Sequence, residues 1–129
     1  MRRVIVVNMK DYIFADAVAQ ALQADENGEF TVLRAASTEE LLQYGRQCEP
    51  YAVLMEVNGY PPYVLAERLK LRDAIKEKSP GCKIVLVVDE KIDAKIAEEV
   101  KEAKLMGLID QFIFSSISAS YLAALMETL

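Results

Sequence analysis

The chain has 129 residues, of which 53% are hydrophobic and 27% charged, and its formal net charge is −5. This length fits residues 1–129 as a single domain with one packed core, and the hydrophobic content excludes a disordered chain. The acidic balance argues against direct nucleic-acid binding, which needs a basic surface. The lack of histidine removes the commonest general base and the commonest metal ligand.

No apolar run approaches the ~20 residues that a membrane-spanning helix needs, and residues 1–12 lack the apolar core of a signal peptide. We therefore expect a cytoplasmic protein that has no membrane segment. Cys48 and Cys82 lie far apart and have no metal-binding spacing. They are expected to be free, mostly buried thiols.

The first part of the chain predicts a strand, a helix and a second strand. Residues 4–7 are all β-branched, which is typical of a buried strand. Asp11 is placed to cap a helix. The apolar residues of that helix recur at helical spacing: Phe14, Ala17, Val18, Ala21 and Leu22. A turn at residues 25–28 leads into a strand at residues 30–35.

A second helix and a third strand follow. Ser37 with Glu40 three residues later has the form of a capping box, which starts a helix that Pro50 ends. Residues 51–57 are largely apolar and contain one carboxylate, Glu56. Such a run, bounded by turn residues, is typical of a strand buried on both faces of a parallel sheet.

The next segment predicts a helix that starts at Pro61 and Pro62, because proline suits the first helical turn. One face of this helix is expected to lie inside: Leu65, Leu69, Arg72 and Ile75. Residues 79–81 break the helix, and residues 83–88 form a fourth, apolar strand.

The last third predicts a helix, a short strand and a final helix. The Lys/Glu-rich helix at residues 91–104 has an inner stripe and an outer face that is expected to be solvated, and Gly107 ends it. The stripe is Ile92, Ile96, Val100 and Ala103. Residues 112–114 form the fifth strand, and Ser118 caps a helix at residues 121–129. Strands that alternate with helices in this way predict right-handed βαβ units and a doubly wound parallel α/β sheet.

This order of elements resembles the receiver domain of two-component response regulators over nearly the whole chain. The resemblance includes "STEELL" after the second strand and "YAVLMEVN" in the third, against the family's "DLVLLDIN". The segment from Gly107 to Phe112 is similar to the family's "GADDYL". The resemblance implies a flavodoxin-like or CheY-like three-layer α/β/α sandwich with strand order 2-1-3-4-5.

The resemblance also implies a chemistry, the transfer of a phosphoryl group to an aspartate. It needs that aspartate on the third strand and two acidic residues after the first strand that hold Mg²⁺. It also needs a hydroxyl residue that ends the fourth strand and a lysine that ends the fifth. The metal and the lysine neutralise charge on the phosphoryl group, and the hydroxyl donates a hydrogen bond to it.

Each of these positions departs from the family pattern. The acidic pair is Asn8 and Met9, the nucleophile position is Glu56, the hydroxyl position is Val88, and the lysine position is Ser115. Met9 is a poor ligand for a hard cation, and Val88 has no hydroxyl. The longer side chain of Glu56 displaces its carboxylate, a shift that can cost about 100-fold in rate. The sequence therefore predicts a pseudo-receiver with no catalytic residue, no metal and no cofactor.

Two positions of the site have further interpretations. Glu56 is either a fixed mimic of a phosphorylated aspartate or a polar residue satisfied by backbone amides or by Lys10. In the second case Glu56→Gln should change stability by no more than about ±0.5 kcal/mol. Phe112 retains the aromatic side chain of the family's switch, three residues before Ser115.

Two other groups of residues leave alternatives open. Asp11, Asp89, Glu90 and Glu56 could gather and bind a divalent ion, or they could be helix caps and surface acids. The aromatic loop at residues 60–63 could dock a partner or act as a lid, or it could start a helix with two rings packed on the core edge.

The leading functional interpretation is a non-enzymatic signalling module that contacts a protein partner or a fused output domain, with a homodimer through residues 112–129. The fifth strand is expected to be an open edge, and Tyr121 with Leu125 or Leu129 to lie outside the core. The alternative is a flavodoxin-like ligand-binding domain or enzyme that uses the strand-end crevice. It lacks support, because the chain has no glycine-rich phosphate loop.

Overall fold

The computed structural model describes residues 2–91 and 93–129, which form five strands in one sheet and five helices. The strands are β1 (Arg3–Asn8), β2 (Phe30–Arg34), β3 (Ala52–Val57), β4 (Lys83–Val88) and β5 (Gln111–Phe114). The helices are α1 (Tyr12–Gln23), α2 (Thr38–Gln47), α3 (Leu65–Lys78), α4 (Ala94–Leu105) and α5 (Ala119–Glu127). The strands pair in parallel in the order β2-β1-β3-β4-β5, which confirms the predicted topology.

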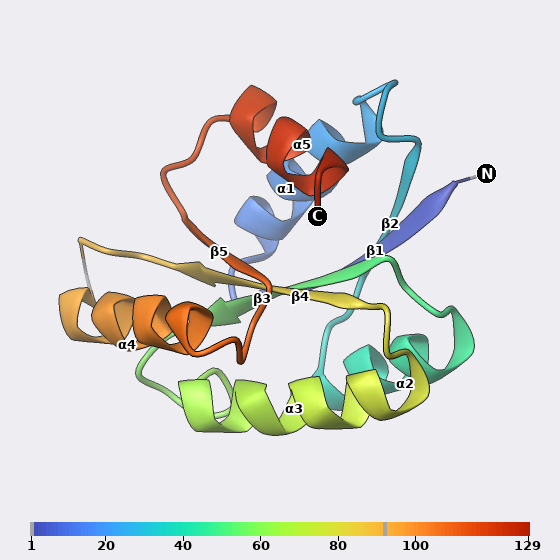
Figure 1. Ribbon diagram of the computed structural model, residues 1–129. Helices are drawn as coiled ribbons and strands as arrows, with labels where there is room; N and C mark the ends of the chain where they lie inside the picture. Colours follow the sequence, from blue (N-terminus) through green and yellow to red (C-terminus); the bar gives the residue numbers. More distant parts are fainter. Residues whose placement is uncertain (1, 92) are drawn as a thin grey trace.

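Helices cover both faces of the sheet (Figure 1). α1 and α5 lie on one face, and α2, α3 and α4 lie on the other, so the molecule has three layers. Successive side chains of a strand point to opposite faces, and the two apolar clusters follow this alternation. Leu54 belongs to the cluster beneath α1 and α5, whereas its neighbour Met55 belongs to the other cluster. The central strands are buried on both faces, which explains their nearly continuous apolar sequences.

The predicted helix caps are confirmed. The carboxylate of Asp11 accepts hydrogen bonds from the amides of the first turn of α1, at 2.9 and 3.2 Å. The Ser37 hydroxyl accepts from the amide of Glu40, whose own carboxylate accepts from the amide of Ala36, both at 3.1 Å. The Ser118 hydroxyl caps α5 in the same way at 3.2 Å. These bonds satisfy amides that a helix start would otherwise leave without partners.

The prediction that Gly107 ends α4 is also confirmed. Gly107 adopts a φ of 79°, a left-handed conformation that glycine tolerates without a steric cost. Its amide donates to the carbonyl of Lys104 at 3.0 Å, and the amide of Leu108 donates to the carbonyl of Ala103 at 2.9 Å. This pair of bonds ends the helix and turns the chain towards β5.

The predicted start of α3 is wrong. Pro61 and Pro62 lie in a turn, and the helix begins at Leu65 after an extended Val64. Proline disfavours the helical conformation in the residue before it, so two consecutive prolines keep Tyr60 and Pro61 out of the helix.

The predicted inner faces of three helices need correction. In α3 the buried residues are Arg68, Leu71 and Ile75, whereas Leu65, Leu69 and Arg72 are only half-buried. Ala17 of α1 is exposed, because the buried face of that helix is centred on Val18. In α4, Ala97 joins Val100 and Ala103 inside, Ile96 is half-buried, and the prediction for Ile92 lies outside the described residues.

Both cysteines are free thiols, as predicted. Cys82 is buried just before β4, and this burial raises its pKa to about 12, so the thiol stays protonated near neutral pH. Cys48 at the end of α2 is half-buried. Among residues 2–91 and 93–129, no helix is long and apolar enough to span a membrane.

Candidate functional site

The predicted site residues meet at the carboxyl edge of the sheet. In the register of the strands, Asn8 lies beside Met55 and Glu56 beside Val87. The amide of Ser115 donates to the carbonyl of Val88 at 3.0 Å. This edge is where parallel α/β sheets place ligands and chemistry.

The two positions that would hold a metal ion in the family are used by the fold itself. Asn8 is 2% exposed, and its side-chain amide donates to the carbonyl of Ala35 at 2.9 Å, which ties the end of β1 to the end of β2. Met9 packs in the apolar cluster beneath α1 and α5. Neither residue offers a carboxylate, which is the ligand Mg²⁺ prefers, so this pair does not fit the ion.

Glu56 is half-buried, and its carboxylate is engaged on both oxygens. One oxygen accepts from the backbone amide of Lys10, and the other from the side-chain amide of Asn58, both at 2.9 Å. The ammonium of Lys10 lies instead 5.6 Å from the centre of the Tyr60 ring. The predicted hydrogen bond from a backbone amide to the Glu56 carboxylate is therefore confirmed. The interpretation of Glu56 as a mimic of a phosphorylated aspartate stays a prediction.

Arg68 is a further residue of this site, and the sequence analysis does not predict it. It contacts the backbone carbonyls of Glu56 and Asn8. Its side chain is 0% exposed, and its Nε–H donates to the carbonyl of Glu56 at 2.8 Å. One terminal nitrogen, Nη2, reaches the carbonyl of Asn8 at 3.5 Å, and the ring of Tyr63 lies 4.8 Å from the guanidinium carbon. The signal in the sequence is weak, because Arg68 and Arg72 both fit the helical stripe of Leu65 and Ile75, and the pattern predicts Arg72 on the inner face.

The charge of Arg68 is held inside the protein. Burial lowers the pKa of its guanidinium to about 10, an effect that Tyr63 and Glu56 partly oppose. The side chain is therefore still a cation at neutral pH. Its other terminal nitrogen, Nη1, is buried without a hydrogen-bond partner among the described residues.

Val88, Ser115 and Phe112 occupy the other predicted positions. Val88 is buried at the end of β4, and Ser115 is half-buried after β5. Phe112 packs against the cluster on the α4 side of the sheet, and its ring meets that of Phe114 edge to face at 5.7 Å. The ammonium of Lys101 lies 5.7 Å from the centre of the Phe114 ring.

The alternative of a divalent-ion site built from acidic residues is wrong. Asp11 caps α1, and the carboxylate of Asp89 accepts from the amide of Lys91 at 3.0 Å. Within residues 2–91 and 93–129, no group of three or more Cys, Asp or Glu residues could hold a metal ion.

The two tyrosines of the aromatic loop, residues 60–63, lie in different environments. Tyr63 packs on Arg68, whereas Tyr60 is 70% exposed. Asn58 holds this turn together through two hydrogen bonds. Its side-chain oxygen accepts from the backbone amide of Tyr60 at 2.8 Å, and its backbone amide donates to the carbonyl of Tyr63 at 3.0 Å.

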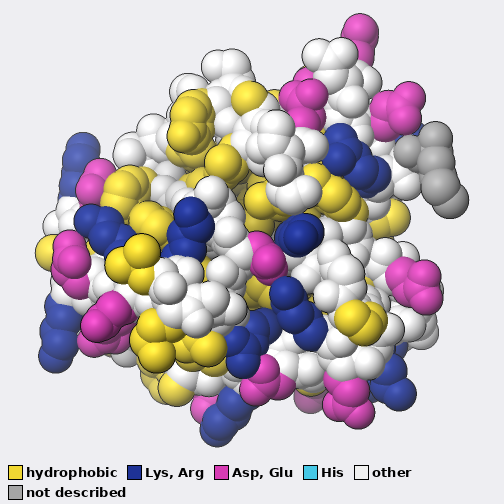
Figure 2. Space-filling view, in the orientation of Figure 1, with side chains coloured by type: hydrophobic (Ala, Val, Ile, Leu, Met, Phe, Trp, Pro, Cys, Tyr) yellow, Lys and Arg dark blue, Asp and Glu magenta, His cyan; other side chains and the backbone are white. Residues whose placement is uncertain are grey.

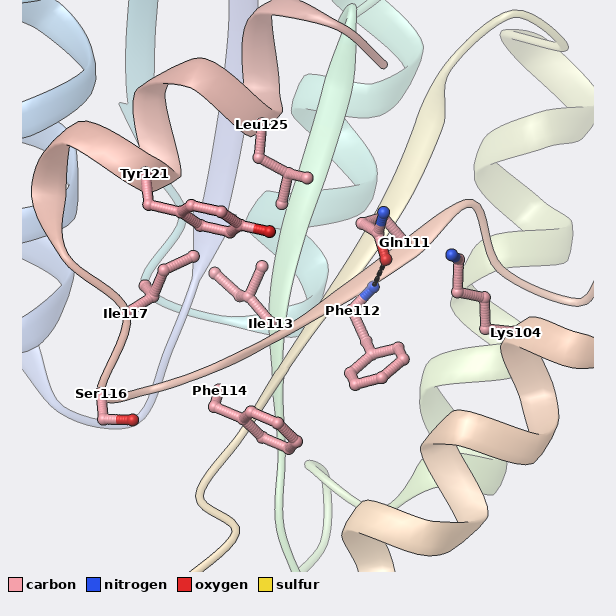
Figure 3. Close-up of a pocket in the computed structure, with 9 residues that line it drawn as sticks. All are labelled: Lys104, Gln111, Phe112, Ile113, Phe114, Ser116, Ile117, Tyr121 and Leu125. Carbon is pink, nitrogen blue, oxygen red and sulfur yellow. Dashed lines mark hydrogen bonds between the residues drawn. The ribbon is translucent and has the colours of Figure 1, made fainter.

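A second feature is an apolar groove along β5, with a volume of about 380 Å³. Its main lining residues are Phe112, Ile113, Phe114, Ile117, Tyr121 and Leu125. Figure 3 shows Tyr121 and Leu125 of α5 on one side of β5 and the two phenylalanine rings on the side of α4. Tyr121 is 61% exposed and Leu125 is half-buried, so the prediction that they reach outside the core is confirmed for Tyr121 and partly for Leu125. Figure 2 shows hydrophobic side chains on this face of the molecule, with both basic and acidic side chains between them.

The edge of the sheet along this groove is less open than predicted. The strand order confirms that β5 is an edge strand. However, the amide of Phe112 is covered by the side-chain oxygen of Gln111 at 3.0 Å (Figure 3). Capping of this kind removes a donor that another strand could pair with. The groove is therefore better suited to side-chain packing than to strand addition.

The contacts of Glu56 change the expected effect of its substitution. We expect Glu56→Gln to lower the free energy of unfolding by about 1–2 kcal/mol, because glutamine has only one acceptor oxygen for the two donors on Glu56. Urea unfolding followed by circular dichroism measures this cost. Glu40→Gln is the matched control and should stay within about ±0.5 kcal/mol, because Glu40 accepts through one oxygen only. Equal effects in the two variants would contradict this account of Glu56.

No protein-family model matches the sequence, and no curated protein matches it. Solved structures do match. A response regulator from Thermotoga maritima aligns over 99% of this chain and 97% of its own, with a TM-score of 0.78 and 20% identity. A CheY-like receiver domain protein from Methanospirillum hungatei aligns over 99% and 93%, with a TM-score of 0.72 and 15% identity.

A third similar structure is that of NtrX from Brucella abortus, with a TM-score of 0.76 and 20% identity. The match covers 99% of this chain and 27% of NtrX. The three matches share the strand order and the helix placement described above over almost the whole of this chain. The chain therefore has the fold of the response regulator receiver (CheY-like) domains of two-component systems.

Proposed function

We propose that residues 1–129 are a pseudo-receiver, a single non-enzymatic signalling domain that acts by protein contact and independently of phosphorylation. One observation carries this proposal: the side chains at the two metal positions make structural contacts within the domain and offer no carboxylate. Asn8 binds the end of β2, and Met9 lies in the core. Without carboxylates at these positions, the charge of a transferring phosphoryl group would lack its usual metal counter-ion.

The remaining positions support the same proposal. Val88 is an apolar side chain where a hydroxyl would donate to the phosphoryl group, and Ser115 replaces the lysine. Each oxygen of the Glu56 carboxylate accepts a hydrogen bond, which lowers its nucleophilicity and fixes its orientation. A cytoplasmic location stays a prediction.

The groove along β5 is the proposed contact surface, and we propose a homodimer through residues 112–129. Its apolar lining, with Tyr121 largely exposed, is the kind of surface that marks an interface. A fused output domain or another protein partner could use the same face. NtrX, in which the matching part is 27% of the chain, is an example of a receiver-like fold within a longer protein.

One experiment tests both parts of the proposal. The protein is treated with acetyl phosphate and MgCl₂, and its intact mass and sedimentation profile are compared with those of an untreated sample. We expect an unchanged mass and the same dimer fraction in both samples. A phosphate adduct that is lost on Glu56→Gln would overturn the phosphorylation-independent function.

A further inference from the structure

The carboxyl ends of β1 and β3 share one buried cation. Arg68 lies in the first turn of α3, and its guanidinium donates to the last carbonyl of β1, that of Asn8, and to that of Glu56 near the end of β3. The two strands are neighbours in the sheet. A guanidinium can bridge them because its donors form a rigid planar fork.

A fully buried cation is unfavourable unless nearby groups compensate it. Here the compensation comes from the two strand-end carbonyls, from the face of the Tyr63 ring and from the negative charge of Glu56. Glu56 is thus linked to Arg68 twice, through its carbonyl and through its charge.

The same contacts continue outward to the surface. The carboxylate of Glu56 binds the side-chain amide of Asn58, and the side-chain oxygen of Asn58 binds the amide of Tyr60. The other carboxylate oxygen binds the amide of Lys10, whose ammonium faces the Tyr60 ring. Two routes therefore connect the buried guanidinium with the exposed Tyr60. Both pass through Glu56, and they continue through Asn58 and through Lys10.

We propose that Arg68 is a positioning residue that supplies the fixed positive charge of this site and holds Glu56 and the Tyr60 turn in one arrangement without a metal ion. The inference deepens the proposed function, because it states what holds the site where the family pattern has a metal ion. A divalent cation beside this guanidinium would be repelled, since the two charges would meet in a poorly screened interior.

Amide hydrogen exchange measured by NMR tests this proposal. The four reporter amides are those of Lys10, Asn58, Tyr60 and Tyr63, each of which is hydrogen-bonded in the site. Arg68→Met keeps an unbranched side chain that can stay buried, but it is shorter and lacks the charge and the donors. We expect these amides to exchange about tenfold faster or more in this variant, relative to the amide of Leu54, which reports global unfolding. Added MgCl₂ should leave the wild-type rates unchanged.

The matched control is Arg72→Met, the same substitution one turn further along α3. Arg72 donates to the carbonyl of Leu108 at 2.7 Å, away from the site, so the four reporter amides should keep their wild-type protection. Arg68→Lys retains the charge but not the fork, and we expect an intermediate acceleration. If Arg68→Met does not fold, Arg68→Lys tests the role of Arg68 in its place.

Two outcomes would overturn the role of Arg68. The first is wild-type protection of the four amides in Arg68→Met or, failing that variant, in Arg68→Lys. The second is a change of their protection when MgCl₂ is added to the wild type. These results are independent of the acetyl phosphate experiment, because a phosphate adduct would overturn the proposed function and leave the exchange pattern of the Arg68 variants as it is.

Discussion

Met126→Ala should lower the free energy of unfolding by about 2–5 kcal/mol. Met126 is 0% exposed on the inner face of α5, in the cluster that also contains Ile5 and Leu54. Truncation to alanine removes buried apolar surface and leaves a cavity between α5 and the sheet, and both effects destabilise. Urea denaturation followed by circular dichroism measures the loss.

Leu105→Ala provides the control for this prediction. Leu105 is 87% exposed at the end of α4, so its truncation should change stability by no more than about ±0.5 kcal/mol. A cost below about 1 kcal/mol for Met126→Ala would show that α5 does not pack on the sheet as described.

Tyr121→Glu should weaken the proposed self-association by about tenfold or more while the domain stays folded. Tyr121 lies on α5, one turn before Leu125, and lines the groove along β5. A carboxylate placed there would lose its hydration in an apolar contact, which is costly without a partner. In the free protein the same carboxylate stays in water, so stability should change little.

Sedimentation equilibrium at micromolar concentration measures the change. Gln20→Glu is the matched control, because it adds the same charge at an exposed position of α1, outside the groove, and should leave the dimer fraction unchanged. A wild-type protein that is strictly monomeric, and that Tyr121→Glu leaves unaltered, would overturn the proposed dimer.

The sequence by itself determined the elements and their order, because these depend on local signals. β4 occupies the predicted residues 83–88, and the caps at Asp11, Ser37 and Ser118 each act on amides two or three residues away. The topology then followed from the alternation of strands and helices, since right-handed βαβ connections leave few arrangements. The loss of the phosphorylation chemistry was also predicted from single residue types at known positions, and it stays a prediction.

Only the tertiary structure decided which charges enter the core and what Glu56 binds. Arg68 and Arg72 are equivalent in the helical pattern. Of the two, Arg68 lies next to two strand ends, and the carbonyls there accept hydrogen bonds from its guanidinium. The contact between Glu56 and the amide of Lys10 joins residues far apart in the chain, as does the bond from Asn8 to Ala35. Such contacts depend on how the strand ends and loops pack together. A buried cation is tolerated only where that packing supplies its partners, and residue spacing does not encode those partners.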